Sequence, residues 1–209
     1  KITYDKDDQK AKVKFVSVDD EGVETPLDTK YNIDDLAGKS GDKIPEEKVQ
    51  TRVDVLKSMG YDVVDNPFDQ DPTFDTKKEI DQEFTIKVKP QVSTAKPVYV
   101  VEGDKPSSEK LKDAVTTKGN EKTVDETKLP DTTDKVGDDT LTAPVTVTYG
   151  SGDNKREETV NVPIKVVEGY PQIVPVDPKE APKAEDSINP DDYPAGSKFT
   201  YEKEPDTTT

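Results

Sequence analysis

Alternation of apolar and polar residues is clearest in two stretches of the first ninety residues, and it predicts β-strands at 11–18 and 83–88. A turn signal, Asp19-Asp20-Glu21-Gly22, follows the first stretch, so residues 23–33 are predicted to return as a second strand. The residues expected to point inward are Ala11, Val13 and Phe15 in the first strand, and Phe84, Ile86 and Val88 in the last.

A helical period separates these strands. Val49, Val53, Leu56 and Met59 share one face at helical spacing. Pro45 suits the first turn of this helix and Gly60 suits its end, after which residues 61–64 form another short strand. The order β-β-α-β-β predicts a β-grasp fold for residues 1–89, with the helix covering one face of a mixed sheet.

The second half of the chain reads as a separate β-rich module. Residues 90–97 begin and end with proline and are predicted to form a linker. In the module at 98–169, residues 107–115 predict a short helix capped by Ser107 or Ser108, with Leu111 and Val115 inward. Residues 144–149 and 159–166 are rich in β-branched residues and flank a glycine-rich turn, which predicts a hairpin.

Two short motifs recur near the end of the chain. Pro130-Asp131-Thr132-Thr133 returns 75 residues later as Pro205-Asp206-Thr207-Thr208, and the stretch 105–109 is echoed at 181–185. Residues 170–209 are therefore predicted to be the truncated start of a second repeat that lacks its hairpin. We expect Tyr170 to Pro175 to continue from the preceding strand, and the rest of this tail to be ordered by contacts outside its own repeat.

Composition limits the possible partners. Only 29% of residues are hydrophobic and 36% are charged, which favours several small modules with thin cores. The net charge is −16 without any basic block, so nucleic acid and anionic membranes are excluded as expected partners. The sequence has no signal peptide and no span of membrane length, and we expect it to be a piece of a longer exported protein.

Residue chemistry argues against catalysis. The chain has no His and no Cys, so the commonest general base and two common nucleophiles or zinc ligands are missing, and we expect neither enzyme activity nor a cofactor. Acidic clusters at 5–8, 19–21, 69–71 and 138–139 lack EF-hand spacing, and we interpret them as solvated turns without bound metal. Asparagines 66, 120, 154 and 161 lack a partner motif for a lysine isopeptide bond. Aromatic residues that could stack on a sugar are Tyr4, Tyr31, Tyr61, Phe68, Tyr99, Tyr149, Tyr170, Tyr193 and Tyr201; for Tyr61 and Tyr149 we expect a core position.

Several segments of the first module resemble the mucus-binding repeats of lactobacillar surface proteins. They are the stretches 8–13, 36–41, 60–64, 74–75, 81–82 and 84–88. The second module is similar to the Rib/alpha-like repeat at 105–107, 130–133 and 145–149, although Tyr149-Gly150-Ser151-Gly152-Asp153 replaces that family's usual Tyr-Pro-Asp-Gly turn. Residues 194–199 and 205–208 resemble the opening of another such repeat.

The resemblance implies a cell-wall-attached, extracellular adhesion segment of a Gram-positive surface protein. It implies a β-grasp-like module followed by an immunoglobulin-like Rib β-sandwich, in an elongated tandem of mainly β and α+β character. Host mucin glycoprotein or its glycans would be the partner and the Rib-like modules the spacer, with no binding residues carried over. Two alternatives stay open, namely capture of immunoglobulin or another host protein by edge-strand pairing, and a stalk without a ligand. We expect a monomer whose incomplete tail offers an edge for pairing between molecules.

Overall fold

The computed structural model describes residues 5–172 and 180–207, and the chain forms two compact units. The first unit consists of residues up to 92 with 118–121 and 148–157. The second consists of 93–117, 122–147 and 158–209. The predicted mainly β, multi-module fold class is confirmed, while the module boundaries at 89, 97 and 169 stay predictions.

The first unit is built on a mixed sheet with the strand order β2-β1-β5-β4, in which β3 also pairs with β1. The two central strands of this order, β1 and β5, are the first and last strands of the unit's sheet along the chain. They run parallel from the pair Ala11 and Gln82 to the pair Ser17 and Val88. The other pairings are antiparallel. This arrangement is compatible with the β-grasp plan, which stays a prediction. The strands are β1 (Asp8–Val18), β2 (Glu24–Pro26), β3 (Ile33–Lys39), β4 (Tyr61–Asp65) and β5 (Gln82–Pro90).

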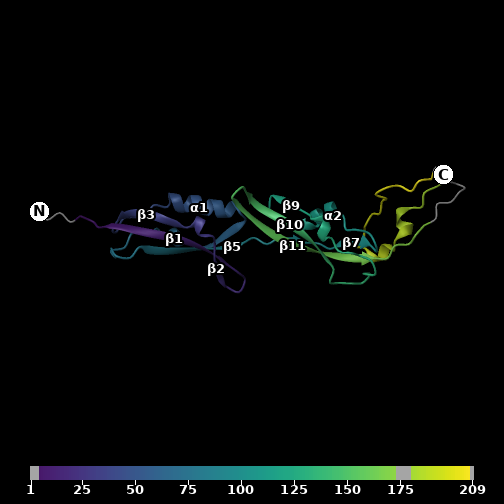
Figure 1. The fold of residues 1–209 in the computed structure, drawn as a ribbon, viewed down its shortest axis with the longest axis horizontal. Coiled ribbons are helices and arrows are strands. Elements are labelled where there is room, and N and C mark those ends of the chain that lie inside the picture. The colour runs from purple at the N-terminus through teal and green to yellow at the C-terminus, as the bar shows by residue number, and fades with distance from the viewer. Residues whose placement is uncertain (1–4, 173–179, 208–209) are drawn as a thin grey trace. The chain divides into compact units, whose positions relative to one another are not determined.

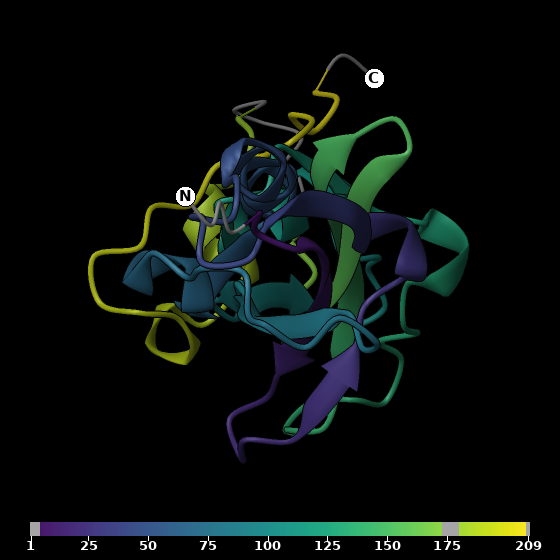
Figure 2. The same cartoon turned by 90° about the vertical axis from the view of Figure 1, so that its left-hand side faces the viewer.

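Helix α1 (Glu47–Ser58) covers one face of this sheet, while the β1–β2 hairpin projects away from the helix (Figures 1 and 2). Helix α1 begins two residues after Pro45, so the proline precedes the helix instead of lying in its first turn. Its predicted apolar face is confirmed, because Val49, Val53, Leu56 and Met59 are at most 5% exposed. They share one buried cluster with the inward residues of the sheet, including Phe15 and Ile86.

The predicted second strand at 23–33 is wrong in its middle. Strand β2 ends at Pro26, a 3-10 turn spans Thr29–Tyr31, and β3 starts only at Ile33. The cause is Asp28, whose carboxylate accepts a hydrogen bond from the backbone N–H of Lys30 at 2.9 Å and so stabilises a turn in place of extended chain. The predicted turn at 19–22 is present, and the Asp19 carboxylate accepts hydrogen bonds from the N–H groups of Glu21 and Val23.

Arg156, in the part of the first unit contributed by residues 148–157, binds the end of α1. Its guanidinium donates hydrogen bonds of 3.0–3.1 Å to the carbonyls of Met59, Gly60 and Gln91. It also lies over the rings of Tyr61 and Tyr149, with its central carbon 5.2 and 4.2 Å from their centroids. Gly60 has a φ of +77°, and a Cβ there would lie 2.4 Å from the Tyr149 ring. Only glycine therefore fits between the helix end and this ring.

The second unit contains most of a four-stranded sheet with the order β7-β11-β10-β9 and a separate two-stranded ladder of β6 and β8. In the four-stranded sheet, β7 and β11 are the first and last strands along the chain. They are neighbours and run parallel, from the pair Val98 and Ile164 to the pair Val101 and Val167. The immunoglobulin-like sandwich stays a prediction. The strands are β6 (Thr94–Ala95), β7 (Val98–Val101), β8 (Val115–Thr116), β9 (Glu121–Thr123), β10 (Thr142–Ser151) and β11 (Asn154–Val167).

Helix α2 (Ser108–Ala114) confirms the predicted short helix. Ser107 is its N-cap, and Leu111 and Val115 are buried. The Pro-Asp-Thr-Thr motif at 130–133 also gains a structural reason, because the buried Thr132 hydroxyl donates to the Asp104 carbonyl at 2.7 Å. The segment predicted to be a linker contains β6 and the buried Ser93, whose backbone N–H donates to Glu158 at 2.8 Å. Its role as a linker stays a prediction.

The described part of the tail, residues 180–207, makes its contacts within the second unit. Residues Gly169 and Ile188 form an isolated antiparallel bridge, and the Tyr170 N–H donates to the Ser187 carbonyl at 2.7 Å. The expected continuation from Tyr170 to Pro175 lies partly outside the described residues. The structure thus places the described tail against its own chain, and pairing between molecules stays a prediction.

Replacing Leu56 by alanine should lower the free energy of unfolding by about 2–5 kcal/mol, because this fully buried side chain fills the space between α1 and the sheet. Chemical denaturation of the two proteins measures the difference. The control is Val64→Ala, which removes apolar atoms from a side chain that is 52% exposed and should change stability little. Equal stability of the Leu56 variant and the parent would contradict the assignment of the buried face.

Replacing Arg156 by glutamine should lower the free energy of unfolding by about 1–2 kcal/mol, because carbonyls of Met59, Gly60 and Gln91 lose a charged donor. The matched control is Lys155→Gln, since Lys155 is exposed and its carboxylate partner Glu157 lies 3.9 Å away. Thermal melts of both variants measure the effect. If the two substitutions cost the same, Arg156 does not hold the helix end.

Candidate ligand-binding grooves

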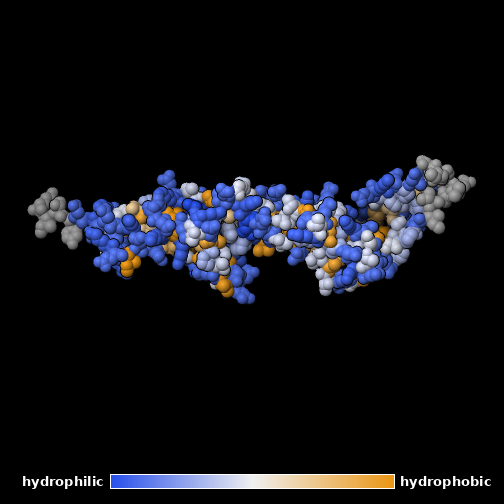
Figure 3. Space-filling view, viewed as in Figure 1, coloured by the Kyte–Doolittle hydropathy of each residue, from blue (hydrophilic) through white to orange (hydrophobic). Residues whose placement is uncertain are grey.

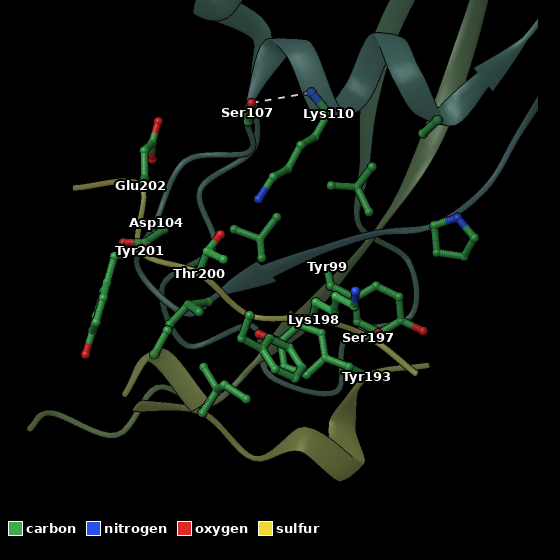
Figure 4. Close-up of a pocket in the computed structure, with 18 of the residues that line it drawn as sticks. Tyr99, Asp104, Ser107, Lys110, Tyr193, Ser197, Lys198, Thr200, Tyr201 and Glu202 are labelled. Carbon is green, nitrogen blue, oxygen red and sulfur yellow. Dashed lines mark hydrogen bonds between the residues drawn. The ribbon is translucent and has the colours of Figure 1, made fainter. Parts of the chain in front are cut away.

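A groove in the described residues lies within the second unit, between β7, α2 and the tail at 184–202. Its volume is about 750 Å³, within the range of about 300–1,000 Å³ common for ligand pockets. Figure 4 shows the side chains that face it from these three elements. The residues used below are Tyr99 on β7, Asp104 and Lys105 in the following loop, Ser107 and Lys110 at α2, and Tyr193, Lys198, Phe199, Tyr201 and Glu202 in the tail.

Packed aromatic rings form one wall of this groove. The ring centroids of Tyr99 and Tyr193 are 5.4 Å apart, and those of Tyr193 and Phe199 are 4.8 Å apart in an edge-to-face arrangement. Asn189 positions Tyr193 by capping the preceding 3-10 turn, with its side chain accepting from the Asp191 N–H at 3.1 Å. Burial raises the pKa of Tyr193, and the nearby carboxylates of Asp192 and Asp104 raise this pKa further.

Cationic side chains also line the groove. Lys110 projects from α2 into the space between the helix and the tail (Figure 4). Its backbone N–H is held by the cap residue Ser107, whose hydroxyl oxygen accepts it at 3.4 Å. In the described part of the chain, the ammonium groups of Lys105, Lys110 and Lys198 make no ion pair. The groove therefore combines apolar ring surface with uncompensated positive charge.

A second groove, of about 730 Å³, lies in the first unit between β3 and α1. It is lined mainly by polar side chains whose positions are fixed by hydrogen bonds. Arg52 donates to the Lys30 carbonyl at 2.7 Å, and Lys48 forms an ion pair with Asp35. The hydrogen bond from Lys48 is the main reason why the pKa of Asp35 is lowered. Asn32, next to β3, and Thr51, on α1, add an amide and a hydroxyl to the lining.

A third groove, of about 580 Å³, lies where β1 begins beside β3. Gln9 is on the inward face of β1 and is only 4% exposed, and its side-chain nitrogen is buried with no hydrogen-bond partner in the described residues. Burying such a donor costs about 1–3 kcal/mol.

The aromatic residues singled out in the sequence separate into two groups. Tyr31, Phe68 and Tyr149 are buried, and Tyr61 is half-buried beneath Arg156, where burial raises its pKa. The expected core position is therefore found for Tyr149, and for Tyr61 in part. Tyr99, Tyr193 and Tyr201 meet at the groove of the second unit, whereas Tyr170 is 39% exposed and Tyr4 lies outside the described residues. The sequence analysis missed Phe199 and Lys110, whose local patterns carry no sign of the groove.

The acidic clusters mostly serve turns and ion pairs. No group of three or more His, Cys, Asp or Glu side chains arranged to hold a metal occurs among the described residues. Asp138 accepts from the Thr140 N–H and hydroxyl at 2.9 and 2.6 Å, and Asp71 pairs with Lys43. Of the asparagines considered for crosslinks, Asn66 caps the 3-10 turn Pro67–Gln70, and Asn120 donates to the Gly150 carbonyl.

The surface shows little apolar area on the face in Figure 3, where hydrophobic residues form small separate spots. Large exposed hydrophobic side chains are few in the described residues and include Val23, Val64 and Ile80. No helix in the described part of the chain is long and apolar enough to cross a membrane.

Acid should destabilise the fold only at low pH. Hydrogen bonds and ion pairs lower the pKa of exposed carboxylates, among them Asp8, Asp20, Asp125, Asp131 and Asp138. A carboxylate with a lowered pKa in the folded state contributes stability above its unfolded pKa of about 3.9, and this contribution is lost as the pH falls through the folded value.

Melting temperature should thus stay level from pH 8 to about pH 5 and fall below about pH 4. Replacing Asp131 by asparagine should lower the melting temperature at pH 7, because a neutral amide oxygen accepts the Thr133 N–H less strongly. The difference from the parent should shrink as the pH falls through the lowered pKa of Asp131, because the parent side chain then loses its charge too. A difference that is independent of pH would show that the charge of Asp131 contributes nothing.

Comparison with known protein families gives a match in the first unit. No curated protein matches the sequence. The matched region begins within β1 and ends at the last residue of β5, so it includes the sheet and the helix of the first unit. Mucin-binding families are binding modules typical of surface proteins. Residues 9–90 match the family described as a mucin binding domain.

Proposed function

We propose that residues 9–90 bind glycans of host mucin glycoproteins and that the chain is an adhesion segment of a bacterial surface protein. The family match over the whole first sheet and its helix is the observation that carries this proposal. The remaining residues would act as a Rib-like spacer in an extracellular, wall-attached protein. A binding role without catalysis agrees with the lack of His and Cys.

The groove between β3 and α1 is the proposed contact surface for the glycan. Sugars are bound by polar side chains held in fixed positions, and this groove is lined by an amide, a hydroxyl and a guanidinium from Asn32, Thr51 and Arg52. The bond from Arg52 to the Lys30 carbonyl holds the guanidinium in place before a ligand arrives. Such preorganisation reduces the entropy lost on binding.

Binding of the purified chain to immobilised mucin tests this function. We expect binding that falls strongly when the mucin is enzymatically deglycosylated, and that weakens about tenfold in an Asn32→Ala/Thr51→Ala double variant. The matched control is Gln50→Ala on α1, which removes an exposed side chain that donates a hydrogen bond to Asp54 at 2.8 Å. Binding that survives deglycosylation, or that the groove variant does not weaken, would contradict the proposal.

The edge of the first sheet favours one alternative. Strand β4 is the last strand in the order β2-β1-β5-β4, and Val64 on it is 52% exposed. An edge of this kind can accept an added strand from a protein partner such as immunoglobulin. The same assay with immobilised immunoglobulin distinguishes protein capture from glycan binding. Val64→Pro should weaken capture of immunoglobulin by this edge and leave glycan binding unchanged.

A further inference from the structure

We propose that the groove between β7, α2 and the tail of the second unit is a separate binding site for an acidic sugar, a hexose or nonulose carrying a carboxylate or sulfate. The site lies outside residues 9–90 and goes beyond the function proposed above. The inference rests on the presence of Lys110, Lys198 and the ring of Tyr193 in the lining of one groove (Figure 4).

The charge of this groove differs from that of the chain. The protein has a net charge of −16, yet the groove is lined by four lysines against three carboxylates. Elsewhere in the described residues several lysines meet carboxylates, as Lys39 meets Asp8 at 2.7 Å and Lys87 meets Glu24 at 2.6 Å. Within the described ranges 5–172 and 180–207, the lysines of the groove make no such pair, although Asp104 and Glu202 also line it. A bound anion would supply the missing partner.

The aromatic wall supplies the second half of sugar recognition. Tyr99, Tyr193 and Phe199 are each half-buried, so they hold one another in place and still expose ring surface to the groove. Apolar C–H faces of a pyranose pack on such rings, and hydroxyl groups nearby bind its polar edge. Ser107 and Thr200 offer hydroxyls on the helix side and the tail side of the groove.

Nucleic acid does not fit this arrangement. A polyanion would meet the carboxylates of the groove and the strongly acidic remainder of the chain. A single acidic group on a largely neutral sugar avoids that repulsion, since it places one negative charge at the lysines and neutral hydroxyls elsewhere. Two sites for glycans in one chain would also raise the retention time on a glycoprotein that carries many copies.

Titration of the full chain with 3′-sialyllactose, a sulfated galactose and lactose tests the proposal by calorimetry. We expect at least one acidic sugar to bind, lactose to bind at least tenfold more weakly, and affinity to fall with added salt. The sialylated and sulfated probes distinguish the two sources of negative charge. Failure of both acidic sugars to bind, or equal binding of lactose, would overturn the proposal.

Two variants then place the binding in this groove. Lys110→Gln should weaken binding of the acidic sugar about tenfold, whereas the control Lys118→Gln, also an exposed lysine without an ion pair in the described residues, should leave it unchanged. Tyr193→Phe keeps the aromatic ring and should retain sugar binding, whereas Tyr193→Leu removes the ring and should abolish sugar binding. The melting temperature of each variant shows whether the protein is still folded. Equal affinity of Lys110→Gln and the parent would refute the site, and mucin binding through residues 9–90 would be unaffected by that result.

Discussion

The parallel pairing of β1 with β5 determines the rest of the first unit. Two parallel neighbours cannot be joined by a tight turn, so the chain between them must cross over the sheet, and α1 provides that crossing. The crossing brings Val53 and Leu56 into one buried cluster with Phe15 and Ile86, which lets a chain with few hydrophobic residues close a small core. It also leaves β4 at one edge and keeps the groove beside β3 open to solvent.

The end of α1 depends on residues far away in the sequence. A helix ends with carbonyl groups that have no partner within the helix, and here the guanidinium of Arg156 supplies donors to Met59 and Gly60. The Tyr149 ring packs where a side chain at position 60 would lie. The family match ends at residue 90, so the helix end is completed by residues outside the matched region.

Much of the secondary structure could be predicted because it depends on local periodicity, as in α1, in the Ser107 cap of α2 and in the long hairpin of β10 and β11. The interruption at Asp28 was missed because the hydrogen bond that its carboxylate accepts from the backbone N–H of Lys30 outweighs β-propensity there. Gln9 occupies an inward position that alternation alone assigns to an apolar residue. The groove could not be predicted from the sequence, since Tyr99 and Tyr193 meet only when the tail folds back on β7.

The two parallel ladders also decide how each unit carries tension. The start of β1 and the end of β5 lie at opposite ends of their ladder, so a pull on these two points loads all seven pairs from Ala11 to Ser17 in shear at once. Separating such a ladder requires its hydrogen bonds to break together, whereas a hairpin pulled at its open end loses them one by one. The ladder of β7 and β11 has the same geometry with only four pairs, from Val98 to Val101. Under stretching in flow, the first unit should therefore hold longer than the second, and the module matched to mucin binding would be the last to lose its fold.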